Sequence, residues 1–306
     1  MDRQREKFTS WQDCYIKQRR FLISYAYRMT GSLADAEDIV QDTVADCLQH
    51  NFASINNPAG WMTRVCSHKA LDLIKSAQQK RNQYIGTWLP DMIPDNLNLA
   101  TVENNQIDQA DSLRIPFLVL LQRLNPVERA VFLLKDVFSY PFKEIAALLD
   151  KSEAACRKIA ERARATIRQN DQDTAKPPFG SEALIQQFFQ AAQMGDQHTL
   201  ETLLAPDSQF FSDGGGKVTA ASMIFSGLAI ATFFSGLSSS PVFAGPYKLE
   251  TLWINQRPGL IISVLGADGT LQIDTIMTFE IWEEKIVQIF AQRNPDKLQM
   301  ISAMNK

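Results

Sequence analysis

The sequence predicts a multidomain protein in which two all-α domains are followed by one α+β domain. Its 306 residues exceed the roughly 100–200 residues of a typical single domain. Apolar residues recur at three- and four-residue spacing over 17–79 and again over 114–168, which is a helical pattern. From residue 181 onward, β-branched and aromatic residues form short runs separated by turn signals, which is typical of strands.

The composition fits a folded globular chain and gives no sign of collagen, coiled coil or wholesale disorder, with 45% hydrophobic and 21% charged residues. The net charge of −3 is unevenly distributed. Residues 1–180 carry 24 Lys and Arg against 22 Asp and Glu, whereas 181–306 carry 7 against 12. Because local basic patches can bind a polyanion even in an acidic chain, nucleic acid is not excluded as a partner.

The cysteines and the termini point to a reducing compartment. Cys14, Cys47, Cys66 and Cys156 form no CxxC pair, so we expect no zinc site, no disulfide framework and no cofactor. The N-terminus lacks the apolar core of a signal peptide. The most apolar stretch, 222–237, is shorter than the roughly 20 residues that span a bilayer, and we interpret it as a buried helix. The expected location is the cytoplasm, with no membrane partner.

The first domain, 1–81, is predicted to be a helical bundle. Gly31 ends one helix, Ser32 caps the next, and Asn56-Asn57-Pro58 separates that helix from a third. The segment 35–46 holds five acids and no base, while 61–81 holds five bases and one acid. The following segment, 82–113, contains no Lys or Arg, five acids and two helix-breaking prolines, which indicates an acidic linker.

The second domain, 114–170, contains a predicted helix-turn-helix. Asn125-Pro126 starts one helix, Pro141 opens a short one, and Ser152 caps the last helix after a tight turn. The stretch 151–168 carries six bases against two acids, on the face opposite its apolar stripe. Such a face can neutralise phosphates or read guanine edges, although a solvated basic face is the alternative. The candidate DNA-binding residues are Ser152, Arg157, Lys158, Glu161, Arg162 and Arg164.

A short linker, 171–180, leads to the third domain, 181–306. Two helical segments precede its strand-like runs, and Arg257-Pro258-Gly259 and Asp268-Gly269 are the expected turns. The run SDGGGK at 212–217 lacks the spacing of a phosphate-binding loop, and Val218 stands where a metal-binding hydroxyl is needed. We therefore predict a hairpin or bulge with positive φ, close to another backbone segment.

The ordered set DAEDIVQDTVADCL at 35–48, NPAGWMTRVCSHKALDLIKSAQQKR at 57–81 and the helix-turn-helix resembles regions 2 and 4 of RNA polymerase sigma-70 family proteins. It most resembles the extracytoplasmic-function group, over residues 15–170. The resemblance implies that core RNA polymerase and promoter DNA are partners, and that the chain carries no polymerase chemistry.

The same resemblance assigns roles to two helices. The acidic helix is expected to bind core polymerase, and the basic helix is expected to bind the −10 element, with Trp61 packing in the core as the alternative to a base platform. The expected polymerase-binding residues are Asp35, Glu37, Asp38, Gln41 and Asp42. The expected −10 residues are Trp61, Arg64, His68, Lys69 and Lys75. The helix-turn-helix residues would bind the −35 element.

The third domain resembles the SnoaL-like, NTF2-like cone that one subgroup of these sigma factors carries at its C-terminus. Three motifs are similar to that subgroup, although Met92-Ile93 departs from its usual linker. They imply regulation in cis, either by holding the sigma regions closed or by completing their contact with polymerase. The motif residues are Trp88, Leu89, Pro90, Asp91, Asp213, Gly214, Gly215, Gly216, Lys217, Asn294, Pro295, Asp296 and Lys297.

Two other functions are compatible with parts of this sequence. A ligand-responsive helix-turn-helix regulator would need no acidic helix beside a melting helix. An enzyme would need convergent acid and base groups in the cone, yet His198 is the domain's one histidine and Asp274 has no identifiable partner in the sequence. We therefore expect no catalysis. A small-molecule ligand in the cone is a further expectation, because such a fold is concave.

Overall fold

The computed structural model describes residues 8–81, 87–95, 111–170, 182–218, 223–239, 245–266 and 269–304. The chain forms two compact units. The first comprises residues up to 80 with 98–113 and 117–172, and the second comprises 81–97, 114–116 and 173–306. Segments 81–97 and 114–116, at the ends of the predicted linker, therefore belong to the C-terminal unit.

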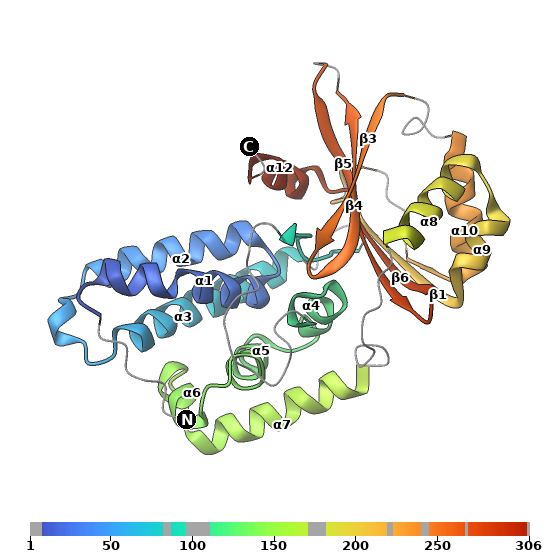
Figure 1. The fold of residues 1–306 in the computed structure, drawn as a ribbon. Helices are drawn as coiled ribbons and strands as arrows, with labels where there is room; N and C mark the ends of the chain where they lie inside the picture. The colour runs from blue at the N-terminus through green and yellow to red at the C-terminus, as the bar shows by residue number, and fades with distance from the viewer. Residues whose placement is uncertain are drawn as a thin grey trace. The chain divides into compact units, whose positions relative to one another are not determined.

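The first unit is helical, as the sequence predicts (Figure 1). A first group of helices precedes the linker and a second group follows it. The first group is α1 (Trp11–Thr30), α2 (Leu33–Leu48), η1 (Phe52–Ser54) and α3 (Pro58–Arg81). The second group is η3 (Asp111–Leu113), α4 (Ile115–Leu121), α5 (Pro126–Phe132), the π-helix η4 (Leu133–Val137), α6 (Phe142–Leu148) and α7 (Glu153–Asn170).

Local capping explains several of these helix boundaries. Gly31 ends α1 with φ of 75°, and its N–H donates to the Tyr27 carbonyl. Ser32 then caps α2, and Asn125 and Glu128 form a capping box at the start of α5. These boundaries are confirmed as predicted. The π-helical turn after α5 was not predicted.

The two helix groups share a core within this unit. The Phe21 ring of α1 packs edge-on against Phe138, with ring centroids 5.0 Å apart, and Tyr25 lies 6.0 Å from the same ring. The buried Arg129 guanidinium donates to the carbonyl of Leu121 at 2.9 Å and to the carbonyl of Met29 at the end of α1. Satisfied buried donors of this kind hold helix ends together.

The second unit is built on a six-stranded sheet with strand order β2-β1-β6-β5-β4-β3. β1 pairs with β6 in parallel, and the remaining neighbours are antiparallel. Helices α8, α9 and α10 lie on one side of the sheet and α12 on the other (Figure 1). The strands are β1 (Leu204–Asp213), β2 (Ile224–Phe225), β3 (Tyr247–Ile254), β4 (Arg257–Leu265), β5 (Leu271–Trp282) and β6 (Lys285–Gln292). The helices are α8 (Glu182–Met194), α9 (Gln197–Leu203), α10 (Gly227–Gly236), η5 (Leu237–Ser239) and α12 (Pro295–Met304).

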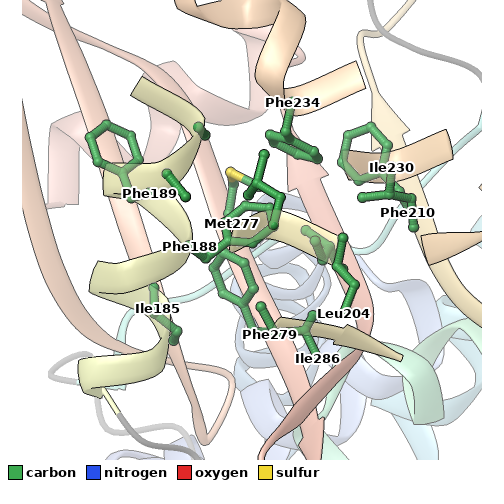
Figure 2. Packing of buried hydrophobic residues seen from close by; sticks show 14 of the residues in the cluster. Ile185, Phe188, Phe189, Leu204, Phe210, Ile230, Phe234, Met277, Phe279 and Ile286 are labelled. Atoms are coloured by element: carbon green, nitrogen blue, oxygen red, sulfur yellow. The ribbon is translucent and has the colours of Figure 1, made fainter. Parts of the chain in front are cut away.

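Aromatic and aliphatic side chains fill the space between this sheet and its helices (Figure 2). Phe188 of α8 contacts Phe234 of α10 and Phe279 of β5, with ring centroids 4.9 and 5.7 Å apart. Edge-to-face pairs of this kind add to the free energy gained by burying the rings. The α+β prediction for this domain is confirmed.

Two local predictions were wrong. Residues 222–237 are not one helix, because Ile224 and Phe225 form an edge strand on β1, and Ser226 caps α10 behind them. The expected turn at Arg257-Pro258-Gly259 lies in β4 instead. The chain reverses at Asn255-Gln256, whose φ angles of 50° and 63° are left-handed. Two consecutive positive φ angles match the twist of a tight hairpin, and Asn tolerates them.

Among the helices described here, none has the length and apolar character needed to cross a membrane.

Candidate functional site

One face of α2 presents acidic and polar side chains to solvent. Asp38, Gln41 and Asp42 are exposed and follow the three- and four-residue spacing of one helix face. Asp35 and Glu37 are half-buried at the helix start, where Glu37 lies 4.0 Å from Arg19. The opposite face of α2 is buried through Ala36, Ile39, Val40 and Thr43.

The basic residues of α3 contact protein groups in this structure. Arg64 donates to the Ala147 carbonyl at 2.9 Å and to the Asp150 carboxylate at 2.8 Å. The His68 Nε2 atom lies 3.3 Å from the same carboxylate. Asp150 occupies the turn between α6 and α7, with φ of 53°. Two residues expected to line an opened DNA strand therefore contact the turn of the helix-turn-helix.

The other expected −10 residues have partners closer in the chain. Lys69 forms an ion pair with Asp46 of α2 at 2.8 Å, and Lys75 pairs with Asp72 one turn earlier at 3.1 Å. The Trp61 indole is half-buried and packs edge-on against the His50 ring, with centroids 5.2 Å apart.

The helix-turn-helix has its expected form. Ser152 accepts the Ala155 N–H at 3.1 Å, and the apolar stripe of α7 is buried through Ile159, Ala163 and Ile167. On the other face, Arg157 lies 4.8 Å above the Phe142 ring and forms an ion pair with Glu153. The remaining side chains on this face either project into solvent or pair with acids: Lys158 and Glu161 are exposed, Arg162 lies 3.7 Å from Glu128, and Arg164 lies 2.8 Å from Asp136.

In the second unit, the three motifs around residues 88, 213 and 294 meet at one place. The Asp213 carboxylate, at the end of β1, is fully buried. It accepts the Leu89 N–H at 3.0 Å and pairs with the Lys297 ammonium at 2.8 Å. Lys297 also donates to the Leu89 carbonyl and lies 4.2 Å above the Trp88 ring. We call this group of contacts the linker clasp.

The linker also attaches to the β3–β4 turn. The Ile93 N–H donates to the Asn255 side chain at 2.7 Å, and the Asn255 N–H donates back to the Ile93 carbonyl at 2.9 Å. Pro94 then forms a β-bridge with Ile254. The Asp95 carboxylate accepts the Gln256 N–H at 3.0 Å, and partial burial raises the pKa of Asp95 above its ordinary value. The segment 89–94 is buried throughout.

The glycine run forms a turn beside the linker clasp. Gly215 and Gly216 have φ of 67° and 68°, so the predicted left-handed backbone is confirmed. The nearby group is the side chain of Asn294 instead of a backbone segment, since a Cβ on Gly215 would lie 2.5 Å from its Cγ. At the surface, Lys217 pairs with Asp296 at 2.7 Å. The motif residues Pro90, Asp91 and Gly214 are buried, and Pro295 begins α12.

Sequence reasoning missed several residues that hold the linker, namely Asp95, Arg114, Asn255, Arg257 and Glu280. The Asn-Gln pair at the hairpin could have been detected from its turn preference. The pairing of charges from distant segments had no sequence signal. The cone interior around Phe188 is filled by apolar side chains, and a ligand there stays a prediction.

Comparisons with known proteins agree with this geometry. A family model described as Sigma-70 region 2 matches residues 15–80, and one described as Sigma-70, region 4 matches residues 114–167. The ECF RNA polymerase sigma factor SigJ of Mycobacterium tuberculosis is 34% identical over 285 residues, covering 91% of this chain and 90% of SigJ. The probable ECF RNA polymerase sigma factor SigI of the same species is 31% identical over 191 residues, covering 61% of this chain and 64% of SigI.

A solved structure is similar across nearly the whole chain. The crystal structure of the M. tuberculosis extracytoplasmic function sigma factor SigJ has a TM-score of 0.70 at 29% identity, covering 93% of this chain and 97% of that one. An acidic helix, a basic helix and a helix-turn-helix, followed by an α+β cone, define a transcription initiation protein of the sigma-70 type.

The chain belongs to the extracytoplasmic-function RNA polymerase sigma factors. It is thus a factor that directs core RNA polymerase to promoters, and its family is not a family of enzymes.

Proposed function

We propose that the C-terminal cone regulates this sigma factor in cis by holding the linker between regions 2 and 4 through the linker clasp. The observation that carries the proposal is the fully buried Asp213 carboxylate, which binds a linker amide and the Lys297 ammonium together. The linker has to be free to change its path when the two sigma regions reach separate promoter elements. The linker clasp restricts that freedom.

The Asp213–Lys297 ion pair is the stable base of the linker clasp, to which the linker binds through Leu89 and Trp88. A buried carboxylate whose partner is removed leaves an uncompensated charge, which costs several kcal/mol. Lys297 is 12% exposed and Asp213 is fully buried, so solvent screens their attraction weakly. Asp213 and Lys297 both belong to the C-terminal unit, so release of the linker leaves their pair intact and removes the two hydrogen bonds to Leu89 and the contact with the Trp88 ring.

The test compares Asp213→Asn with Asp296→Asn in reconstituted transcription. Both variants remove one negative charge from neighbouring motifs, but Asp296 is exposed and pairs only with the surface Lys217 among the contacts described here. The promoters used as templates are identified first, by genome-wide mapping of the sites that the tagged protein binds. We expect Asp213→Asn to change transcript output severalfold while Asp296→Asn does not. Output from Asp213→Asn equal to that of the wild type would overturn the regulatory role.

The acidic face of α2 is the proposed contact for core polymerase. Asp38, Gln41 and Asp42 are exposed together, and an acidic patch suits a basic protein surface. The double reversal Asp38→Lys with Asp42→Lys should abolish co-elution with core polymerase. Glu182→Lys with Glu201→Lys makes the same charge change on exposed residues of the second unit and should leave co-elution intact. Equal loss in both variants would mean that only net charge matters.

The exposed face of α7 is the proposed contact for the −35 element. Arg157 is held by the Phe142 ring and Glu153, so its guanidinium is oriented before DNA arrives. Arg157→Ala should weaken promoter binding by about 1–3 kcal/mol and relax base preference at one −35 position. Lys143 is an exposed residue of α6, and Lys143→Ala should weaken binding uniformly across sequences. Unchanged base preference in Arg157→Ala would contradict base reading by this residue.

A further inference from the structure

A second set of charges in the C-terminal unit is buried and takes no part in the linker clasp. The Glu280 carboxylate of β5 accepts from Arg114 Nε at 3.2 Å and from another nitrogen of the same guanidinium. It also accepts from Arg257 Nε at 3.3 Å. The three side chains are between 5% and 9% exposed. This group, Arg114 with Glu280 and Arg257, is called the anchor triad below.

Arg114 lies at the junction between the linker and region 4. Arg114 is the first residue of the region 4 match, and α4 begins at the next residue. Arg114 belongs to the C-terminal unit together with residues 115 and 116, whereas the chain from Phe117 to residue 172 belongs to the first unit. Glu280 lies 166 residues away in the sequence. The start of region 4 is thus attached directly to strand β5.

The anchor triad lies close to the other attachment of the linker. Arg257 directly follows the Asn255-Gln256 turn that holds residues 93–95, and its guanidinium donates to the Gln256 carbonyl at 2.8 Å. The charge of Arg257 also acts on the pKa of Asp95, lowering it against the larger effect of burial. One strand end of the cone therefore holds the linker at residue 95 and again at residue 114.

The hydrogen bonds between Arg114 and Glu280 make this a strong attachment. A guanidinium that donates two N–H groups to one carboxylate forms a charge-assisted pair with fixed geometry. At this depth water competes weakly for these groups, so loss of Arg114 would cost two strong hydrogen bonds even though Glu280 keeps Arg257 as a partner. Arg is suited to such a site because its planar fork matches both carboxylate oxygens, which Lys cannot do.

We propose that Glu280 is the residue that positions the start of region 4, and that through Arg114 the cone holds the linker at both of its ends. The proposal rests on the regulatory function proposed above and deepens it. Two attachments on one body reinforce each other, because release of one leaves the free end close to its site. Each attachment then opposes release of the other, so weakening either one shifts promoter output.

The test uses hydrogen exchange of the full chain, read on the amides of residues 112–118 other than Pro116, which has no N–H. Arg114→Met removes the attachment but leaves Glu280 paired with Arg257. Arg257→Met is the matched control, since it removes the other arginine and leaves the two Arg114 hydrogen bonds in place. We expect exchange to rise about tenfold or more in Arg114→Met and to stay within about twofold in Arg257→Met. Arg114→Lys keeps the positive charge and is the second variant, used if Arg114→Met does not fold. It should give an intermediate rise in hydrogen exchange.

The outcomes separate this proposal from the regulatory one. Wild-type exchange at 112–118 in both Arg114 variants would overturn the anchor. If exchange rises but neither Arg114→Met nor Asp213→Asn changes transcript output, the anchor stands and the regulatory function fails. If Asp213→Asn changes output while Arg114→Met changes neither exchange nor output, the linker clasp regulates alone and the anchor is wrong.

Discussion

Arg64 of α3 and Asp150 of the α6–α7 turn form a 2.8 Å ion pair between the two helix groups of the sigma regions. His68 lies 3.3 Å from the same carboxylate. The Asp150 carboxylate therefore contacts two of the side chains that the sequence assigns to the −10 element.

The first prediction concerns this pair. Asp150→Asn should remove the ion pair of Arg64, which keeps its hydrogen bond to the Ala147 carbonyl. The left-handed turn should persist, because Asn tolerates φ near 53°. Both side chains are partly exposed, so the pair is worth at most about 1 kcal/mol. We expect affinity for a single-stranded −10 oligonucleotide to rise up to about fivefold in fluorescence anisotropy.

The control for this prediction is Glu144→Gln on α6, which removes the same charge from an exposed site that contacts no α3 residue among the contacts described. If only the loss of one negative charge mattered, both variants would raise affinity for the oligonucleotide equally. The ion pair contributes only if Asp150→Asn exceeds Glu144→Gln.

The second prediction concerns the glycine turn. Gly215→Ala places a Cβ 2.5 Å from the Asn294 side chain and forces alanine to a φ of 67°. The backbone cost is about 1–2 kcal/mol and the contact adds to it. Gly269→Ala is the matched control, since its φ is 76° and nothing lies within 4 Å of its Cβ. Hydrogen exchange of β1 and β6 in urea should rank Gly215→Ala as clearly less stable. Equal loss in the two variants would mean that Asn294 moves aside freely.

The third prediction concerns pH. Burial raises the folded-state pKa of Asp95, so its contribution to stability is fully present below the unfolded value of 3.8 and is lost as pH rises through the folded value. Asp95→Asn keeps an acceptor for the Gln256 N–H but carries no charge. The variant should hold the linker more tightly than the wild type at pH 7 and equally at pH 3.5, measured by hydrogen exchange at Ile93. A less protected linker in the variant at pH 7 would show that the carboxylate charge is favourable there.

The fourth prediction concerns the thiols of the first unit. Burial raises the pKa of Cys47 to about 12 and that of Cys66 to about 12, since the thiolate is disfavoured away from water. At pH 8 their thiolate fraction is therefore about 10³-fold below that of an ordinary cysteine. Iodoacetamide should label both slowly in the native protein and rapidly after urea unfolding, as followed by mass spectrometry. Rapid native labelling of either thiol would contradict its burial.

Much of the fold could be predicted because its signals are local. Ser152 and the Asn125–Glu128 capping box act over three residues, and runs of β-branched and aromatic residues between turn signals predicted the long strands. The edge strand at Ile224 was missed because two residues are too short for a pattern. The hairpin turn was misplaced because Pro258 and Gly259 were the stronger turn signals, yet Pro258 pairs with Trp253 inside the sheet.

The sequence by itself determined the fold class, the family and the acidic and basic helix faces, since each depends on spacing within a few residues or on motifs read in order. The tertiary structure alone decided which partner each charge takes. Leu89 and Asp213 are 124 residues apart, and Arg114 and Glu280 are 166 apart. Pairing at such separations depends on which surfaces the folded core brings together and on how deeply it buries them, and neither can be read from local spacing.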